Sequence, residues 1–162
     1  MYTDNRTVQI VISLLKEFQV RHLVLSAGTR NVPFVHSVEN DSYFNCYSIV
    51  DERSAAYFAL GLALETGEPV LMSCTSGTAT TNYTSAMWEA FRQKLPLIAL
   101  TSDRNQYYLN QLEDQMISQA GLYRSACRKS VTLPIVEDEK DAWYCRRLVN
   151  EALLELDHRG GG

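Results

Sequence analysis

The sequence predicts an α/β fold in which a parallel β-sheet is flanked by helices on both faces. Short apolar runs typical of buried strands alternate with longer segments of helical periodicity. Strands separated by helices favour parallel pairing, because each connection has to cross one face of the sheet. Polar residues also gather where several of the predicted strands end. Ligands bind at that edge in sheets of this kind.

The first quarter of the chain is expected to form two helices and one strand. Residues 7–18 carry the i, i+3, i+4, i+7 apolar stripe of a surface helix. The apolar run 22–26 is expected to be the first strand. It ends in a turn at residues 27–30, where Gly28 can approach a ligand closely or take a positive φ. Residues 33–38 are expected to form a short helix, because a proline favours the first helical turn.

The next segment predicts a second strand joined directly to a helix. The run 46–50 is apolar enough for a buried strand, and Asp51 is placed to cap the helix that follows. Residues 54–64 carry the helical pattern, and Gly67 is expected to end it. A third strand is expected at residues 69–74.

The second half predicts two further strands and two helices. A helix is expected to follow residue 79 and reach about Lys94, and residues 96–101 read as a fourth strand. Residues 105–119 are polar and irregular. A late strand is expected at residues 130–135, where a proline favours an edge or strand-end position. Asp138 is expected to cap a final amphipathic helix.

Composition narrows the class of protein. The 162 residues suit one ordinary domain, and 46% hydrophobic with 21% charged residues is typical of a folded globular chain. The net charge of −4 gives no basic face for nucleic acid. No apolar run approaches the ~20 residues that cross a membrane, and the polar start does not resemble a signal peptide. We therefore expect no nucleic-acid partner, no membrane association and a cytoplasmic location.

Cysteine and histidine show no metal-binding pattern. The four cysteines form no C-x-x-C pair, and the three histidines lack the spacing of metal ligands. We therefore expect no metal bound by the groups of this chain alone.

Four polar clusters are expected to meet at one edge of the sheet. They lie around Thr29 and Arg30, at Glu52, at the turn 75–78, and at residues 103–104. Because the carboxyl ends of parallel strands share an edge, these clusters predict a single ligand site. Each cluster also has a structural explanation that requires no ligand. Glu52 could simply complement the positive end of its helix, and either arginine could be a solvated surface residue.

The turn formed by Thr75, Ser76, Gly77 and Thr78 could serve as a phosphate cradle at a helix N-terminus, but it lacks the spacing and the lysine of a P-loop. The turn is better explained as a hydroxyl-rich cap beside a flat ring, or as a helix cap with nothing bound.

No serine lies in a G-x-S-x-G elbow, so a hydrolase has little support. Arg30 and Arg104 are guanidinium groups at strand ends, suited to carboxylates.

Four motifs together resemble a known family. Residues 51–63 (DERSAAYFALGLA) are similar to the signature of the pyrimidine-binding (PYR) domain of thiamine diphosphate enzymes, and more narrowly of the SEPHCHC synthases of menaquinone biosynthesis. Residues 74–79 (CTSGTA), 96–104 (PLIALTSDR) and 115–123 (QMISQAGLY) resemble that family's successive motifs in order and spacing. The likeness extends from about residue 26 to residue 123 and continues more weakly to the end.

The resemblance implies a catalytic role for Glu52. In the family this glutamate hydrogen-bonds a ring nitrogen of the cofactor's aminopyrimidine, which favours the tautomer that forms the reactive ylide. The family decarboxylates 2-oxoglutarate and adds the succinyl group to isochorismate. The match also implies that Thr75, Ser76, Gly77 and Thr78 lie beside thiamine diphosphate. The implied ligands of the carboxylated substrates are Thr29, Arg30, Arg104 and Gln115.

The chain departs from the family pattern near the implied substrate site. Ala27, Thr29 and Asn105 replace a proline, a serine and a proline, and residues 112–114 (LED) replace Gly-Ala-Asn. The acidic pair Glu113 and Asp114 is expected to weaken binding of a dianionic acceptor unless it points away. Alternatives are therefore another thiamine diphosphate-dependent 2-oxo acid decarboxylase or synthase, for example in a cell-surface glycan pathway, and a non-catalytic interaction domain of the same fold.

No part of the chain resembles the motif that holds Mg²⁺ and the diphosphate in this superfamily. We expect residues 1–157 to form a PYR-type domain and residues 158–162 to begin a linker to central and diphosphate-binding domains, which lie further along the same chain or in a partner. The family's site forms between subunits, so a homo-oligomer is expected. This chain by itself is expected to be inactive.

Overall fold

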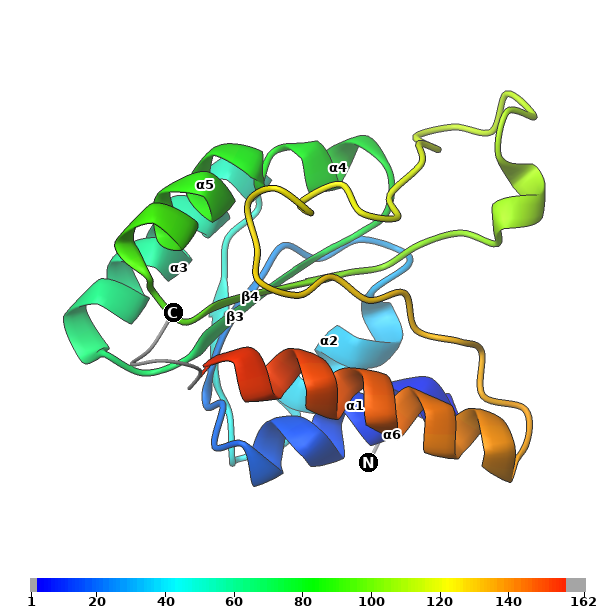
Figure 1. The fold of residues 1–162 in the computed structure, drawn as a ribbon, viewed down its shortest axis with the longest axis horizontal. Coiled ribbons are helices and arrows are strands. Elements are labelled where there is room, and N and C mark those ends of the chain that lie inside the picture. Colours follow the sequence, from blue (N-terminus) through cyan, green and yellow to red (C-terminus); the bar gives the residue numbers. More distant parts are fainter. Residues whose placement is uncertain (1–2, 157–162) are drawn as a thin grey trace.

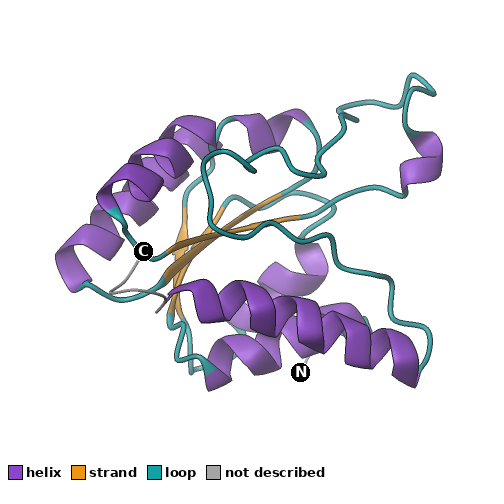
Figure 2. Cartoon of the chain, in the orientation of Figure 1, coloured by secondary structure: helices purple, strands orange, loops and turns teal. Residues whose placement is uncertain are grey.

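The computed structural model describes residues 3–156 and contains one parallel sheet between two layers of helices (Figures 1 and 2). The strands are β1 (His22–Leu25), β2 (Asn45–Ser48), β3 (Val70–Cys74) and β4 (Leu97–Thr101). They pair in the order β2-β1-β3-β4, and every pairing is parallel. The predicted fold class is confirmed, and the predicted linker at residues 158–162 lies outside the described residues.

Helices cover both faces because successive strand residues point to opposite sides. Leu23, Leu25 and Leu71 pack in a cluster with α1 (Arg6–Glu17), α2 (Val32–Glu39) and α6 (Glu139–Leu153). The intervening strand residues, among them Val24 and Met72, pack against α3 (Glu52–Thr66) and α5 (Thr84–Gln93). All five residues of β3 are buried, as expected for a central strand covered on both faces.

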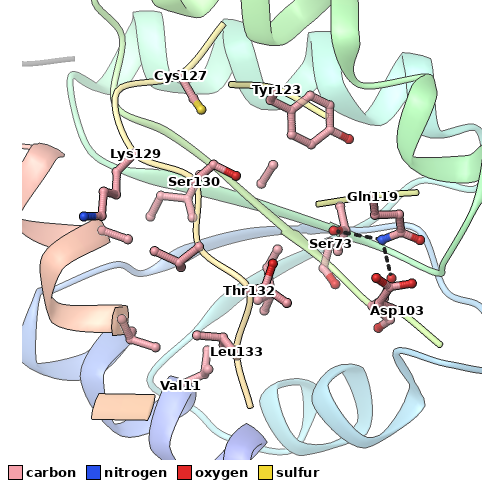
Figure 3. Close-up of a pocket in the computed structure, with 18 of the residues that line it drawn as sticks. Val11, Ser73, Asp103, Gln119, Tyr123, Cys127, Lys129, Ser130, Thr132 and Leu133 are labelled. Atoms are coloured by element: carbon pink, nitrogen blue, oxygen red, sulfur yellow. Dashed lines mark hydrogen bonds between the residues drawn. The ribbon is translucent and has the colours of Figure 1, made fainter. Parts of the chain in front are cut away.

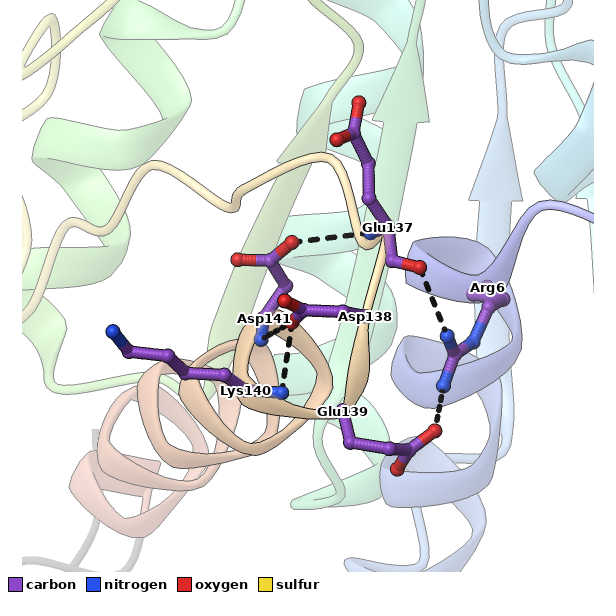
Figure 4. A network of polar contacts seen from close by, with 6 residues as sticks. All are labelled: Arg6, Glu137, Asp138, Glu139, Lys140 and Asp141. Atoms are coloured by element: carbon purple, nitrogen blue, oxygen red, sulfur yellow. Dashed lines mark hydrogen bonds and ion pairs between the residues drawn. The ribbon is translucent and has the colours of Figure 1, made fainter.

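A polar network joins the start of α6 to the start of α1 (Figure 4). The Asp138 carboxylate accepts hydrogen bonds from the backbone N–H groups of Lys140 and Asp141, both at 2.9 Å, so the predicted cap is confirmed. Arg6 forms an ion pair with Glu139 and donates to the backbone carbonyl of Glu137 at 3.4 Å. These contacts hold the two helix N-termini side by side.

The predicted late strand at residues 130–135 is wrong. Within residues 3–156, that segment is extended but pairs with no strand. Pro134 has no N–H to donate, and its carbonyl accepts a hydrogen bond from Thr7 Oγ1 at 3.0 Å, on α1. The segment is therefore bonded to a helix, and a groove separates it from the outer edge of β4.

The single helix predicted to reach Lys94 is also wrong in part. It is divided into α4 (Thr78–Thr81) and α5, with Tyr83 at the break. The Tyr83 side chain is fully buried, so the break turns this large ring into the core.

Of the two glycines with an expected role, Gly67 behaves as predicted, whereas Gly28 does not take a positive φ. Gly67 ends α3 with φ +68°. Gly28 is a point of close approach without a positive φ: a Cβ there would lie 2.6 Å from Thr75 Cβ. The group that Gly28 approaches closely is thus the Thr75 side chain of the same protein.

Residues 3–156 contain no helix that is long and apolar enough to cross a membrane. In the same residues, no three His, Cys, Asp or Glu side chains gather as metal ligands.

Candidate functional site

Glu52 opens α3 immediately after β2, at the carboxyl edge of the sheet. The preceding Asp51 caps the helix by accepting the Ser54 N–H at 2.8 Å, and hydrogen bonding from the Ser54 side chain and from this N–H lowers the pKa of Asp51. Glu52 is half-buried, and within the described residues its carboxylate has no hydrogen-bond or ion-pair partner. A carboxyl group in this position is free to bond one nitrogen of a flat ring that lies against the edge of the sheet.

The turn after β1 is held by a buried side chain that the sequence reasoning missed. Asn31 is 1% exposed and accepts the Gly28 N–H at 2.8 Å. Its amide donates to the Ser26 carbonyl at 3.1 Å and to Ser73 Oγ at 3.4 Å. Asn31 therefore fixes the backbone that carries Thr29 and Arg30, both of which are exposed.

The turn after β3 is shaped by Gly77, which has φ +73° and ψ −132° and forms the N-cap of α4. The Gly77 carbonyl accepts Thr80 Oγ1 at 2.6 Å. No side-chain oxygen caps α4, so the expectation of a hydroxyl cap is wrong. Ser76 is buried, Thr75 packs under Gly28 and Thr78 is exposed. The turn thus presents backbone atoms and the packed methyl group of Thr75 rather than a row of free hydroxyl groups.

Gln119 couples the ends of β3 and β4, and it too was missed. Its Oε1 accepts the Gly77 N–H, and its Nε2 donates to the Ser102 carbonyl at 2.9 Å and to Thr101 Oγ1 at 3.5 Å (Figure 3). The sequence signal for it was an amide residue inside the 115–123 motif, four positions after Gln115. Gln115 itself is exposed, with φ +56°, and its carbonyl oxygen lies over Gly77.

Beneath the turn, the buried phenol of Tyr83, the half-buried phenol of Tyr123 and the buried thiol of Cys74 lie close together. Burial raises the pKa of Tyr83, whose hydroxyl lies near the Cys74 thiol without a hydrogen bond of good geometry in the described residues. Burial also raises the pKa of Cys74 to about 12. The Tyr123 hydroxyl donates to the Thr80 carbonyl. These groups stay protonated at neutral pH, so they support the turn as neutral packing partners.

The two predicted arginines line one groove of about 820 Å³ at the outer edge of β4 (Figure 3). Arg30 enters from the turn after β1 and Arg104 from the end of β4, and Asp103 lies beside them. Burial raises the pKa of Asp103. Glu52, the 75–78 turn, Thr29 and Gln115 are not among the residues that line this groove. Both arginines therefore line the same groove, and Glu52 does not.

Arg104 is already engaged. Its Nη1 lies 2.6 Å from Glu113 Oε2, and its Nε is buried without a hydrogen-bond partner in the described residues. Only one member of the acidic pair points at the predicted anion site. Glu113 contacts Arg104, whereas Asp114 makes no hydrogen bond or ion pair within residues 3–156.

Taken together, these positions fit the aminopyrimidine of thiamine diphosphate. That ring needs one carboxyl for a ring nitrogen and a close-packed backbone beside it. Glu52 supplies a carboxyl that has no partner within the described residues, and Gly28 and Gly77 allow the turns beside it to pack closely, Gly28 against Thr75 and Gly77 against Gln115.

Comparison with known proteins agrees with this fit. Residues 5–122 match the family model described as thiamine pyrophosphate enzyme, N-terminal TPP binding domain. The chain is 46% identical over 162 residues to the 2-succinyl-5-enolpyruvyl-6-hydroxy-3-cyclohexene-1-carboxylate synthase of Bacteroides fragilis, covering all of this chain and 29% of that protein. The protein of the same name from Phocaeicola vulgatus is 43% identical with the same coverage. The one from Desulfotalea psychrophila is 46% identical over 115 residues, which cover 71% of this chain and 21% of that protein.

The chain thus spans less than a third of the length of these curated relatives. Among solved structures, benzoylformate decarboxylase from Polynucleobacter necessarius superposes with a TM-score of 0.59 at 24% identity, over 68% of this chain and 20% of that one. At that identity the likeness supports the fold alone. The family model covers most of the chain, and the name of its family specifies thiamine diphosphate as the ligand. The chain belongs to the family of N-terminal TPP-binding domains of thiamine pyrophosphate enzymes.

Proposed function

We propose that this chain is the cofactor-activating domain of a synthase that decarboxylates 2-oxoglutarate and transfers the succinyl group to isochorismate. The observation that carries the proposal is Glu52, an unpaired, half-buried carboxyl at the first turn of α3 and the carboxyl edge of the sheet. Two relatives that are similar over the full chain are named as synthases of 2-succinyl-5-enolpyruvyl-6-hydroxy-3-cyclohexene-1-carboxylate. The family resemblance described above supplies the substrates and the reaction class, a decarboxylating transferase that forms a carbon–carbon bond.

Glu52 is the proposed catalytic residue because of its place in the fold. Bound here, thiamine diphosphate would supply the nucleophilic carbon and the electron sink for decarboxylation of the 2-oxo acid. Glu52 would hold a proton at its carboxyl oxygen for a ring nitrogen of the cofactor.

The remaining proposed residues divide between cofactor and substrates. Thr75, Ser76, Gly77 and Thr78 form the wall beside the aminopyrimidine, where Gly77 lets the backbone of Gln115 pack against the turn. Arg30 and Arg104, which line one groove, bind the carboxylates of the substrates. Thr29 and Gln115 are the proposed neutral ligands beside them. Both are exposed in this chain, as residues that meet a substrate from the edge of the domain need to be.

The complete enzyme requires parts that this chain does not supply. We propose that residues 1–157 form the PYR-type domain and that Mg²⁺ and the diphosphate are held by a further domain, in the same chain or in a partner. The curated relatives are more than three times as long as the segment they share with this chain, which leaves room for it. The chain alone is then inactive, and the complete protein is a homo-oligomer. The cytoplasm is the proposed compartment, since all four cysteines are free thiols in the structure.

One observation favours a second candidate. Glu113 occupies Arg104, at a position where the SEPHCHC synthases resembled by the sequence usually have a neutral residue. A thiamine diphosphate enzyme that uses a different acceptor, with fewer negative charges, would tolerate that carboxylate better.

The test uses the complete enzyme with thiamine diphosphate and Mg²⁺, and follows loss of 2-oxoglutarate with and without isochorismate. Glu52→Gln is expected to lower kcat by about 10²- to 10⁴-fold, the range of an acid–base residue. The matched control is Glu65→Gln, the same charge change on the exposed face of α3. Full activity in Glu52→Gln would remove the catalytic role. Cofactor binding without turnover of this pair would keep the domain assignment and discard the substrates.

A further inference from the structure

The segment between β4 and the 115–123 motif projects from the sheet and then folds back to it, and most of its residues are exposed (Figure 1). Asn110, Leu112 and Gln115 all have positive φ, at 64°, 61° and 56°. The carbonyl of Gln115 lies over Gly77, and Gln119 is bonded to the same glycine. Both ends of the segment are therefore held by the sheet.

This folded-back segment delivers one carboxylate to Arg104. Glu113 Oε2 lies 2.6 Å from Arg104 Nη1, a charge-assisted contact across nine residues. The side chain of Arg104 is 16% exposed and that of Glu113 44% exposed, so water screens the pair only partly. The next residue, Asp114, is exposed and makes no hydrogen bond or ion pair with the part of the chain that the structure describes.

Arg104 retains unused donor capacity. A guanidinium presents five N–H groups in a planar fork that matches a carboxylate with two parallel bonds. Glu113 accepts one hydrogen bond from Nη1, and Nε is buried without a hydrogen-bond partner among the described residues. An incoming carboxylate that uses this fork meets the negative charge of Glu113 at the same group.

We propose that Glu113 is a specificity-determining residue, a tethered carboxylate that occupies the Arg104 anion site and that a carboxylated substrate must displace. This rests on the proposed function in one respect, that Arg104 binds a substrate carboxylate. Glu113 lowers the affinity of every carboxylate at this site, and it does so most for those with two negative charges.

The test compares two charge changes at adjacent positions in the complete enzyme loaded with cofactor. Glu113→Gln keeps the length and an oxygen acceptor for Arg104 but removes the charge. Asp114→Asn removes a charge one residue away without touching Arg104. Two readouts are taken: the KM for isochorismate, and equilibrium binding of succinate by calorimetry, which needs no turnover.

Glu113→Gln is expected to tighten succinate binding and lower the KM by about two- to fivefold, the range of a partly exposed ion pair. Asp114→Asn is expected to change neither value. The gain is expected to shrink in about 0.5 M salt, because screening weakens the competing pair. In the Arg104→Gln background, the Glu113→Gln gain is expected to disappear, which places the coupling at Arg104.

Each other result contradicts the proposal in a recognisable way. Weaker binding in Glu113→Gln would mean that Glu113 positions Arg104 for the substrate. An equal effect of Glu113→Gln and Asp114→Asn on succinate binding would mean that the overall negative charge near the site matters, and not the contact of Glu113 with Arg104. Absence of turnover with 2-oxoglutarate and isochorismate would remove the proposed function, while succinate binding would still decide the role of Glu113. Succinate binding unaffected by any of these changes would overturn the inference alone.

Discussion

Substitution of Gly77 by alanine tests how the segment after β4 packs on the site. Gly77 has φ +73° and ψ −132°, a combination that residues with a Cβ rarely adopt. An added Cβ would lie 1.2 Å from the carbonyl oxygen of Gln115. That neighbour is backbone and cannot rotate away, so either the turn or the covering segment has to move.

The expected cost has two parts. The positive φ costs about 1–2 kcal/mol for any residue with a Cβ. Displacing the packed segment adds about 1–3 kcal/mol, which includes loss of the hydrogen bond between Gly77 and Gln119. Gly77→Ala is therefore expected to lower the free energy of unfolding by about 2–5 kcal/mol.

Alanine substitutions at two other glycines measure the φ cost separately from the packing cost. Gly67 has φ +68°, but a Cβ there meets nothing within 4 Å, so Gly67→Ala reports the φ cost alone, about 1–2 kcal/mol. Gly61 lies inside α3 with nothing within 4 Å and no positive φ. Gly61→Ala is expected to stabilise the chain by about 0.5–1 kcal/mol through helix propensity.

The assay is urea unfolding of the 162-residue chain, followed by far-ultraviolet circular dichroism, with m-values compared across the series. Limited proteolysis between residues 103 and 119 reports whether the segment has been released. Equal costs for Gly77→Ala and Gly67→Ala, with no new cleavage, would show that the segment does not cover Gly77 in solution. That result would also weaken the placement of Glu113 against Arg104.

Two further predictions concern ionisable groups. The hydrogen bond and ion pair with Lys16 lower the pKa of Asp41 from 3.8, so this pair stabilises the fold above that value and loses its effect as pH falls through the lowered pKa. After allowance for solvent screening, Asp41→Asn is expected to lower the free energy of unfolding by about 0.5 kcal/mol at about pH 7 and by almost nothing at about pH 2.5. Urea unfolding measures both values, and a loss of stability that grows on acidification would contradict the predicted direction. Because burial raises the pKa of Cys74 to about 12, iodoacetamide at about pH 8 is expected to modify the half-buried Cys127 well before Cys74 in the folded chain, and Cys74 only in urea. Mass spectrometry of timed samples checks the order, and early modification of Cys74 would show that β3 opens.

Local signals in the sequence determined most of the secondary structure. Four apolar runs became the four parallel strands, with ends shifted by one or two residues. Asp51 and Asp138 cap their helices, and Gly67 ends α3. Each of these features depends on a few neighbouring residues, since a cap or a left-handed terminus is satisfied within one turn of chain. The resemblance to the family likewise came from short motifs in register, and the family model confirms it.

Only the tertiary structure decided which polar groups meet. The segment at residues 130–135 has strand composition but bonds to α1, because pairing depends on what lies opposite rather than on propensity. Asn31 and Gln119 fix the turns of the site through bonds to residues up to 42 positions away.

The contact of Glu113 with Arg104 depends in the same way on a segment that folds back through three positive-φ residues. Propensities and caps are short-range effects encoded next to the residues they act on. Hydrogen bonds and ion pairs between distant segments form only once the packed core has fixed where those segments run.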